Sequence, residues 1–264
     1  MASNRPQASD GSVRKSHNNN NRHSNDNSRR RNPSSHRHHQ RQHKPRADRG
    51  TVHLTQNLQR LVSSGKPSAL QEADNKIRHH LRHWSTDATT YPRPNEFTFG
   101  VLLAAYCKAR HLPGAAVKAE ELLQVMISEY ERQEKEEASS GGRQKVWLVP
   151  STHCVSAAIS AWSKNSNMVL GKGDVDAIHR ATATIRRLEE LHSQYGREET
   201  KPNESVYNAL LSVIAFVNNG KGAGRELSVE QRQRNAEYAE SIVKDMEERA
   251  ARGDASVQPS QRTF

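Results

Sequence analysis

The chain has 264 residues, a formal net charge of +11 and only two cysteines, Cys107 and Cys154. It contains no apolar run long enough for a membrane span or a secretory signal, so we expect an intracellular protein with no membrane segment. The two cysteines do not form a C-x-x-C pair. Packing roles in a reducing compartment are therefore favoured over zinc binding or a disulfide.

Residues 1–50 differ in composition from the rest of the chain. They contain ten arginines, two lysines and three aspartates, a net charge of +9, and the remaining residues therefore carry only +2 of the total. Almost no aliphatic side chain is present there to bury, which predicts a disordered basic tail. Three roles stay open for this tail: an arm that attracts nucleic acid, an organelle-targeting sequence, or a solvated extension without a partner.

Histidines cluster in two places, and neither cluster predicts a metal site. The first is a run in the tail: His36, His38, His39 and His43. It has neither a cysteine nor an ordered scaffold to fix ligand geometry. The second is His79 with His83, four residues apart on a predicted helix, where no third ligand is near in sequence. We therefore expect an exposed helix face there, and no metal or other cofactor.

From residue 51 onward, apolar residues recur at the spacing i, i+3, i+4, i+7, which is one face of an α-helix. A proline precedes three of these helices and the opening of a fourth, at spacings of 56, 52 and 57 residues. The prolines are Pro94, Pro150, Pro202 and Pro259. The predicted helix pairs are 51–64 with 68–84, 95–110 with 113–135, 151–164 with 174–195, and 203–217 with 228–252.

The second helix of each pair has its own pattern, a small residue followed by apolar residues four and seven positions later. Ala119, Ala181 and Ala239 are these small residues, and we expect them to be buried against a partner helix. A weaker copy runs through Leu70, Ala73 and Ile77, with His80 in the last apolar place. The pattern predicts an all-α solenoid of about three and a half helix hairpins over residues 51–264. Because the last copy, Gln258–Phe264, only opens a first helix, we expect further repeats to be missing.

The order of these features resembles the pentatricopeptide repeat. Each copy has a proline, a small polar residue, a core residue (Phe99, Val155 or Tyr207) and two aliphatic residues, then a second helix of the form A-x-x-x-L-x-x-M. The resemblance covers residues 51–264 and is strongest from Pro94 onward. The spacing here is longer than the family's, and the surplus falls in 134–149, 165–173 and 218–227. Insertions at such places are loops that leave helix stacking intact.

The resemblance implies a protein that recognises single-stranded RNA at one base per repeat, on a concave face built from the first helices. In the family, the recognising pair is the residue after the aromatic of the first helix and the last residue before the next repeat. The corresponding pairs here are Gly100 with Ser151, Ser156 with Asn203, and Asn208 with Ser260. The resemblance implies adenine for the second pair and a pyrimidine for the third, whereas glycine leaves the first degenerate. Ser151, Asn203 and Ser260 also have the residue types that cap helices, and the two roles are compatible.

No catalytic motif is present, so we expect a non-enzymatic RNA-binding protein that acts in transcript processing, stability or translation. The alternative is a helical-repeat scaffold for protein–protein interaction, which the near-neutral repeats favour, because RNA binding ordinarily uses lysine and arginine. A basic first-helix face would discriminate the two. Large side chains at helical spacing, such as Tyr106 and Trp162, are expected in the core rather than as base-stacking platforms. For location, the resemblance implies the mitochondrion, with the cytoplasm and the plastid as alternatives.

Overall fold

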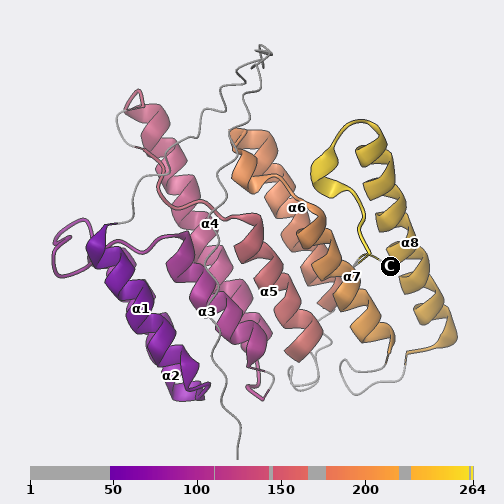
Figure 1. Ribbon diagram of the computed structural model, residues 1–264, viewed down its shortest axis with the longest axis horizontal. Helices are drawn as coiled ribbons and strands as arrows, with labels where there is room; N and C mark the ends of the chain where they lie inside the picture. Colours follow the sequence, from indigo (N-terminus) through magenta and orange to yellow (C-terminus); the bar gives the residue numbers. More distant parts are fainter. Residues whose placement is uncertain are drawn as a thin grey trace, which may run out of the picture. The chain divides into compact units, whose positions relative to one another are not determined.

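The computed structural model of the chain describes residues 48–109, 111–142, 145–165, 177–219, 227–261 and 263. These residues form eight α-helices and two short 3-10 helices, with no strand among them, so the all-α prediction is confirmed. The helices are α1 (Arg49–Ser63), α2 (Pro67–His83), α3 (Glu96–Lys108), α4 (Ala115–Ser139), α5 (Thr152–Asn165), α6 (Ala177–Tyr195), η2 (Glu198–Thr200), α7 (Glu204–Asn218), α8 (Val229–Ala251) and η3 (Ala255–Val257). They succeed one another in chain order across the molecule (Figure 1).

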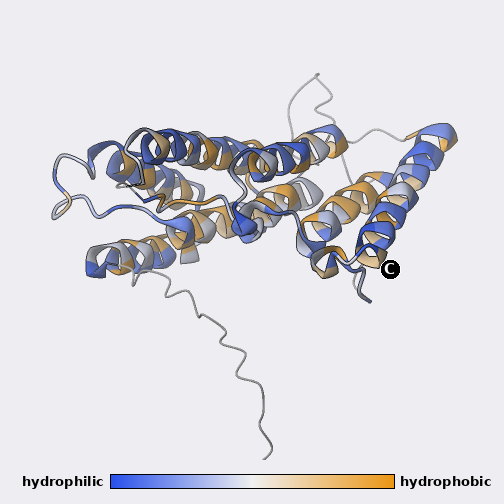
Figure 2. Ribbon diagram, turned by 90° about the horizontal axis from the view of Figure 1, so that it is seen from above, coloured by the Kyte–Doolittle hydropathy of each residue, from blue (hydrophilic) through white to orange (hydrophobic). Residues whose placement is uncertain are grey.

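The helices pack as hairpins in two layers. The first helices form one row, in which α3 contacts α1 and α5, and α5 contacts α7. Among the second helices, α4 packs against α3 and α5, while α6 packs against α5 and α7. Hydrophobic positions gather between the layers, and hydrophilic ones line the outer side of the second helices (Figure 2). Each hairpin thus completes the core of its neighbour, as expected for a helical-repeat solenoid.

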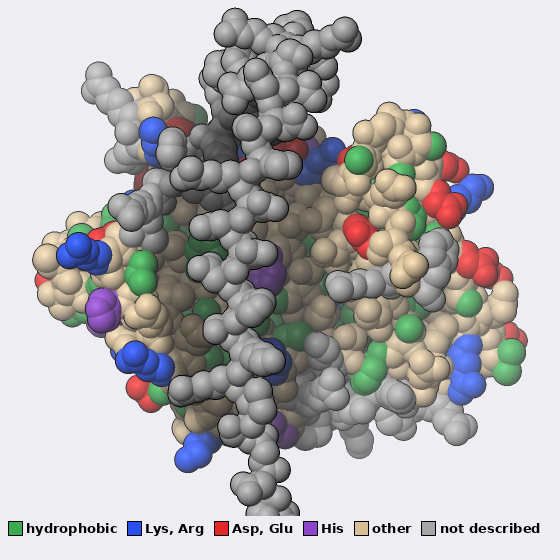
Figure 3. Space-filling view, viewed as in Figure 1, with side chains coloured by type: hydrophobic (Ala, Val, Ile, Leu, Met, Phe, Trp, Pro, Cys, Tyr) green, Lys and Arg blue, Asp and Glu red, His purple; other side chains and the backbone are tan. Residues whose placement is uncertain are grey.

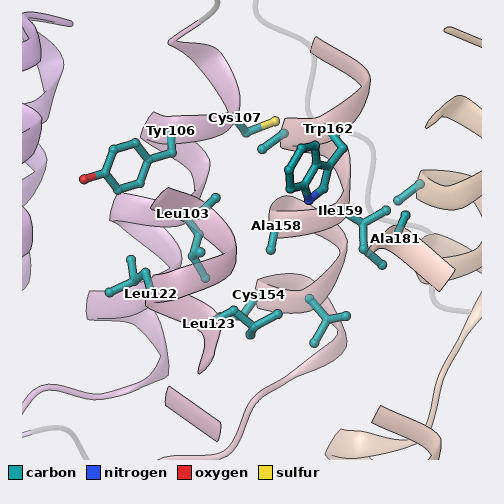
Figure 4. Packing of buried hydrophobic residues seen from close by; sticks show 14 of the residues in the cluster. Leu103, Tyr106, Cys107, Leu122, Leu123, Cys154, Ala158, Ile159, Trp162 and Ala181 are labelled. Carbon is teal, nitrogen blue, oxygen red and sulfur yellow. The ribbon is translucent and has the colours of Figure 1, made fainter. Parts of the chain in front are cut away.

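The core is continuous along the row. Tyr106 of α3 and Trp162 of α5 are each 1% exposed, and Leu122 and Leu123 of α4 are fully buried. Figure 4 shows Ala158, Ile159 and Trp162 on one helix, facing Leu103 and Cys107 on one side and Ala181 on the other. Phe99 and Tyr207 are also buried, so the core assignment of these large side chains is confirmed.

Helix boundaries differ from the predicted ones by a few residues, for local reasons. The first helices α3, α5 and α7 begin one residue later than predicted, and Asn95 and Asn203 are the N-caps of α3 and α7 rather than helical residues. Helix α1 instead begins two residues earlier than predicted, at Arg49. Helix α4 starts at Ala115 instead of residue 113, since Gly114 adopts a left-handed φ of 74° that a helix interior excludes. The expected start of α6 at residue 174 lies outside the described residues, as does almost all of the predicted 1–50 tail, whose residues 49–50 already belong to α1.

The predicted burial of the small second-helix residues is right for two repeats and wrong for the third. Ala119 and Ala181 are fully buried. Ala239 is only half-buried, because α8 packs mainly against α7 and η3, with no further hairpin over it among the described residues. The apolar stripe of α8 is also displaced by one residue, with Ile242 buried in place of Val243 beside the fully buried Met246.

The second helices of successive repeats are joined by polar contacts rather than by a close-packed seam. Three ion pairs run from α4 to α6 and the segment after it: Arg180 Nη1 to Glu120 Oε1 at 2.9 Å, Arg187 Nη2 to Glu131 Oε1 at 2.6 Å, and Arg197 Nε to Glu134 Oε1 at 2.8 Å. Between α6 and α8, the Thr182 and Tyr238 hydroxyls lie 3.1 Å apart. Among the described residues, no helix is both long and apolar enough to cross a membrane.

His80 of α2 stands at the position where the second helices of the other repeats have an apolar residue. The side chain is 8% exposed, and its Nδ1 lies 3.1 Å from the carbonyl oxygen of Pro92, which ties α2 to the connector before α3. Desolvation by burial lowers the pKa of His80, and the positive charge of Lys76 adds to this, while the bond to the Pro92 carbonyl opposes it. The folded state therefore favours the neutral imidazole.

Acid is expected to destabilise the fold partly through His80. Because its pKa is lowered on folding, the stability that it contributes is fully present above about pH 6.5 and is lost as the pH falls below that value. Urea unfolding at about pH 7.5 and about pH 5.5 measures this loss. Changing His80 to Gln should flatten the dependence, whereas changing the exposed His53, which is not among the groups acting on His80, to Gln should leave it intact; equal slopes in the two variants would contradict the assignment.

Candidate nucleic-acid interface

The first helices present their N-terminal ends in one register, set by capping residues. Asn95 Oδ1 accepts a hydrogen bond from the backbone N–H of Thr98 at 3.0 Å, and Thr98 Oγ1 accepts one from Asn95 N at 3.2 Å, which completes a capping box. Asn203 caps α7 in the same way, by accepting from the N–H three residues later at 3.4 Å. Ser260 repeats half of the box, because its N–H donates to Thr263 Oγ1 at 3.1 Å. The capping role of Asn203 is thus confirmed.

The capping residues also reach back to the preceding repeat. Asn203 Nδ2 donates to Thr152 Oγ1, the first residue of α5, at 3.1 Å. Ser260 Oγ donates to the carboxylate of Glu204, the first residue of α7. The cap of α7 is therefore hydrogen-bonded to the first residue of α5, and Ser260 makes the corresponding contact with the first residue of α7.

The structure brings together one of the three predicted recognition pairs. Asn208 Nδ2 donates to Glu204 Oε1 at 2.9 Å, and Ser260 Oγ donates to the same oxygen, so Glu204 bridges the third pair. In the second pair, Ser156 Oγ donates within its own helix to His153 O at 3.1 Å, and no contact with Asn203 joins the two side chains. All four members of these pairs are half-buried rather than freely exposed.

The first predicted pair has little to offer a ligand. Gly100 is buried in α3, and Ser151 is half-buried at the start of α5. A Cβ atom added at Gly100 would lie 3.7 Å from His153 Cδ2 and 3.8 Å from Cys154 Sγ, which are ordinary contact distances. The space next to Gly100 is therefore adequate for a methyl group, although it is enclosed by α5.

Changing Gly100 to Ala is accordingly expected to stabilise the protein by about 0.5–1 kcal/mol, because glycine inside a helix loses more backbone entropy on folding than alanine does. Chemical denaturation of the two proteins measures the difference. A loss of stability would mean that α3 and α5 approach each other more closely at this point than the structure shows.

A fourth polar pair, which the sequence analysis missed, lies at the first hairpin. Thr55 Oγ1 is 3.0 Å from Thr98 Oγ1, which in turn donates to Asn95 Oδ1 at 3.0 Å. Thr55 follows Leu54 in α1 as Gly100 follows Phe99 in α3, so it holds the equivalent position. The signal was present in the sequence, since Leu54, Leu58 and Leu61 repeat the spacing of the core residues of α3.

A second feature missed from the sequence is an exposed aromatic ring beside these pairs. Phe97, in the first turn of α3, is 63% exposed, unlike Phe99 two residues later, which is fully buried. The equivalent positions in the other first helices hold Val52, which is 41% exposed, and the exposed His153 and Ser205. These four residues form an outward row that runs next to the polar pairs.

The first-helix row is close to neutral. Its charged residues with described side chains are Arg49, Arg60 and Lys108 against Glu96 and Glu204. In the space-filling view, basic and acidic side chains are scattered over the visible edges of the molecule (Figure 3). A strongly basic face, which would have favoured RNA over a protein partner, is therefore not a property of the described first helices.

The histidines and cysteines supply no second site. The rings of His79 and His83 are tilted by 51° with centroids 4.6 Å apart, and Tyr91 packs against both. No group of three or more metal-binding side chains occurs where the chain is described. The histidine run of the tail lies outside the described residues. Cys107 and Cys154 are both buried, as expected for packing roles, and burial raises the pKa of the Cys154 thiol to about 12.

Comparison with known protein families, with curated proteins and with solved structures finds no match to this chain.

Proposed function

We propose that this protein is a non-enzymatic, single-stranded RNA-binding helical-repeat protein that acts in transcript processing, stability or translation. The observation that carries the proposal is the recurrence of hydrogen-bonded polar groups at one end of successive first helices: Thr55 with Thr98, Asn203 with Thr152, and Asn208 and Ser260 through Glu204. A mitochondrial location, implied by the pentatricopeptide resemblance, belongs to the same proposal.

The chemistry of these positions suits base edges. Asparagine offers both donors and acceptors, and a hydroxyl that already donates one hydrogen bond can still accept another. The Oδ1 atom of Asn208 is buried without a hydrogen-bond partner among the described residues, so a base would reach it only after the side chain turns outward. At the start of α3, an unstacked base next to Asn95 would have the exposed ring of Phe97 close by. Aromatic side chains stack on bases of any sequence.

The row itself lacks the charge that RNA binding ordinarily needs, and we assign that role to the tail. Residues 1–50 carry +9, whereas the repeats carry +2. Attraction of phosphates by the tail would be independent of base sequence, and the polar pairs would add discrimination between bases. The tail and the row thus divide affinity and specificity between them.

The test of base recognition is the change of Asn203 to Asp, which is nearly isosteric and keeps an oxygen to cap α7. It replaces the Nδ2 donor by an acceptor, so the preference between bases at one RNA position should change, with a smaller effect on overall affinity. Binding to an RNA library before and after the change measures this. Equal loss of affinity for all sequences would contradict a recognising role, and so would no change at all.

A second candidate function is a scaffold for proteins. The observations that favour it are the near-neutral first helices and the exposed apolar side chains of Phe97 and Val52 on their outer row. The same experiment decides between the two. If the full chain does not bind single-stranded RNA at low salt, the scaffold function takes the place of the proposal.

A further inference from the structure

An open cavity of about 1010 Å³ lies behind the N-terminal end of the first-helix row, within the first two hairpins. Its walls are the C-terminal end of α2, the C-terminal half of α4 and the two connectors that lead into α3 and α5. Residues from four separate segments of the chain therefore meet here, and none of them belongs to the polar pairs described above.

Two tryptophans and an arginine form the centre of this cavity. The rings of Trp84 and Trp147 meet edge to face with centroids 5.4 Å apart. The guanidinium of Arg93 lies 4.6 Å from the centroid of Trp147 and 5.2 Å from that of Trp84. Both indoles are only half-buried, and Arg93 is exposed, so the cluster faces the cavity rather than the core.

The cavity is also positively charged. Five cationic side chains line it and two carboxylates oppose them, a net charge of +3. Both carboxylates, Glu129 and Glu136, are bound to Arg132. Arg93, Lys135 and Lys145 form no salt bridge with a carboxylate among the described residues, although the charge of Asp48 acts on Arg93 from a longer distance. The C-terminal ends of α2 and α4 carry partial negative charge, which repels an anion. Attraction of an anion to this cavity must therefore come from the cationic side chains.

We propose that this cavity binds one nucleotide of the RNA chain, with its phosphate on Arg93, Lys135 and Lys145 and its base against Trp84 or Trp147. The inference rests on the proposed function and adds a contact site outside the repeat row. Arg93 precedes Asn95, the cap of α3, by two residues, at most about 7 Å of extended backbone. An RNA strand on the row thus reaches the cavity without a break. Aromatic rings next to unpaired cations are the features that bind single strands.

The experiment uses the full chain and a short single-stranded RNA oligonucleotide. Changing Lys135 and Lys145 together to Gln should weaken binding about fivefold to tenfold at low salt and reduce the salt slope by up to about 0.7, since one phosphate loses two of its three cations. The matched control changes the exposed Lys66 and Lys244 to Gln, which removes the same charge elsewhere on the surface and should leave affinity nearly unchanged.

Tryptophan fluorescence supplies an independent readout. Trp162 is 1% exposed, so RNA should quench Trp84 and Trp147 only. RNA that binds without quenching, or equal effects of the two lysine pairs, would overturn the cavity site while leaving the proposed function in place. Failure of every form to bind RNA would instead count against the proposed function. Quenching by polyglutamate as strong as that by RNA would show a site for acidic peptides and overturn the nucleotide assignment.

Discussion

Replacing Ala181 with leucine is expected to lower the free energy of unfolding by roughly 1–3 kcal/mol, because extra methylene groups in a packed core force neighbours off their preferred rotamers. Ala181 is fully buried in α6, where that helix meets α5 near Ile159 and Trp162 (Figure 4). Urea denaturation followed by circular dichroism measures the loss. The size of the effect reports how closely the second helix of this repeat approaches its neighbour.

The matched control is the same change at the equivalent position of the last repeat. Ala239 is half-buried, because little covers that side of α8 among the described residues, so leucine there has room to turn outward. We expect a loss of less than about 1 kcal/mol at Ala239. Equal losses at the two positions, or none at Ala181, would contradict the packing of the hairpins.

Removing residues 1–47 is expected to weaken binding to all single-stranded RNA sequences by about tenfold or more at low salt, because phosphate neutralisation by the tail releases counterions. This deletion removes nine arginines and two lysines and leaves α1 intact, since that helix begins at Arg49. A titration between about 50 and about 200 mM salt should show a shallower slope for the shortened chain.

A control for the deletion keeps the length of the tail and replaces its arginines and lysines with glutamine. If charge is what matters, this variant should bind RNA as weakly as the shortened chain does. A shortened chain that binds as well as the full one would instead show that the repeats supply the affinity, and the division of roles between tail and row would be wrong.

The helices were predictable from the sequence because apolar residues recur at helical spacing in every repeat, and because phased prolines precede the first helices from α3 onward. Their first residues were less predictable, because a residue such as Asn203 can open a helix or cap it, and only the hydrogen bond from the third following N–H decides. Burial at Ala239 was not predictable from its own repeat, since it depends on what packs next to α8.

The candidate site was predictable only in part. The pair Asn208 with Ser260 follows from the spacing of the repeats. Its link through Glu204 does not, because Glu204 has no assigned place in the repeat pattern. Thr55 was missed because no proline marks the first hairpin. Phe97 was missed because apolar residues two apart in sequence appear equally suited to the core, although the helix turns one of them outward.

The aromatic cavity could not be found from the sequence. Trp84 ends one hairpin and Trp147 precedes the first helix of another, and neither belongs to the repeating pattern. Their contact with Arg93 arises from the stacking of hairpins, which brings the connectors of successive repeats to the same end of the molecule.

The two rows of helices differ in how they would respond to a mechanical load. The first helices meet through close-packed side chains, whose attraction falls by about a quarter to a half when a gap of about 0.5–1 Å opens. The ion pairs between the second helices, such as Arg187 with Glu131, join long and partly exposed side chains that can change rotamer while staying paired, at a cost of about 1 kcal/mol or less each. The stack thus has one stiff side and one compliant side, so it bends most easily by opening or closing the spaces between its second helices.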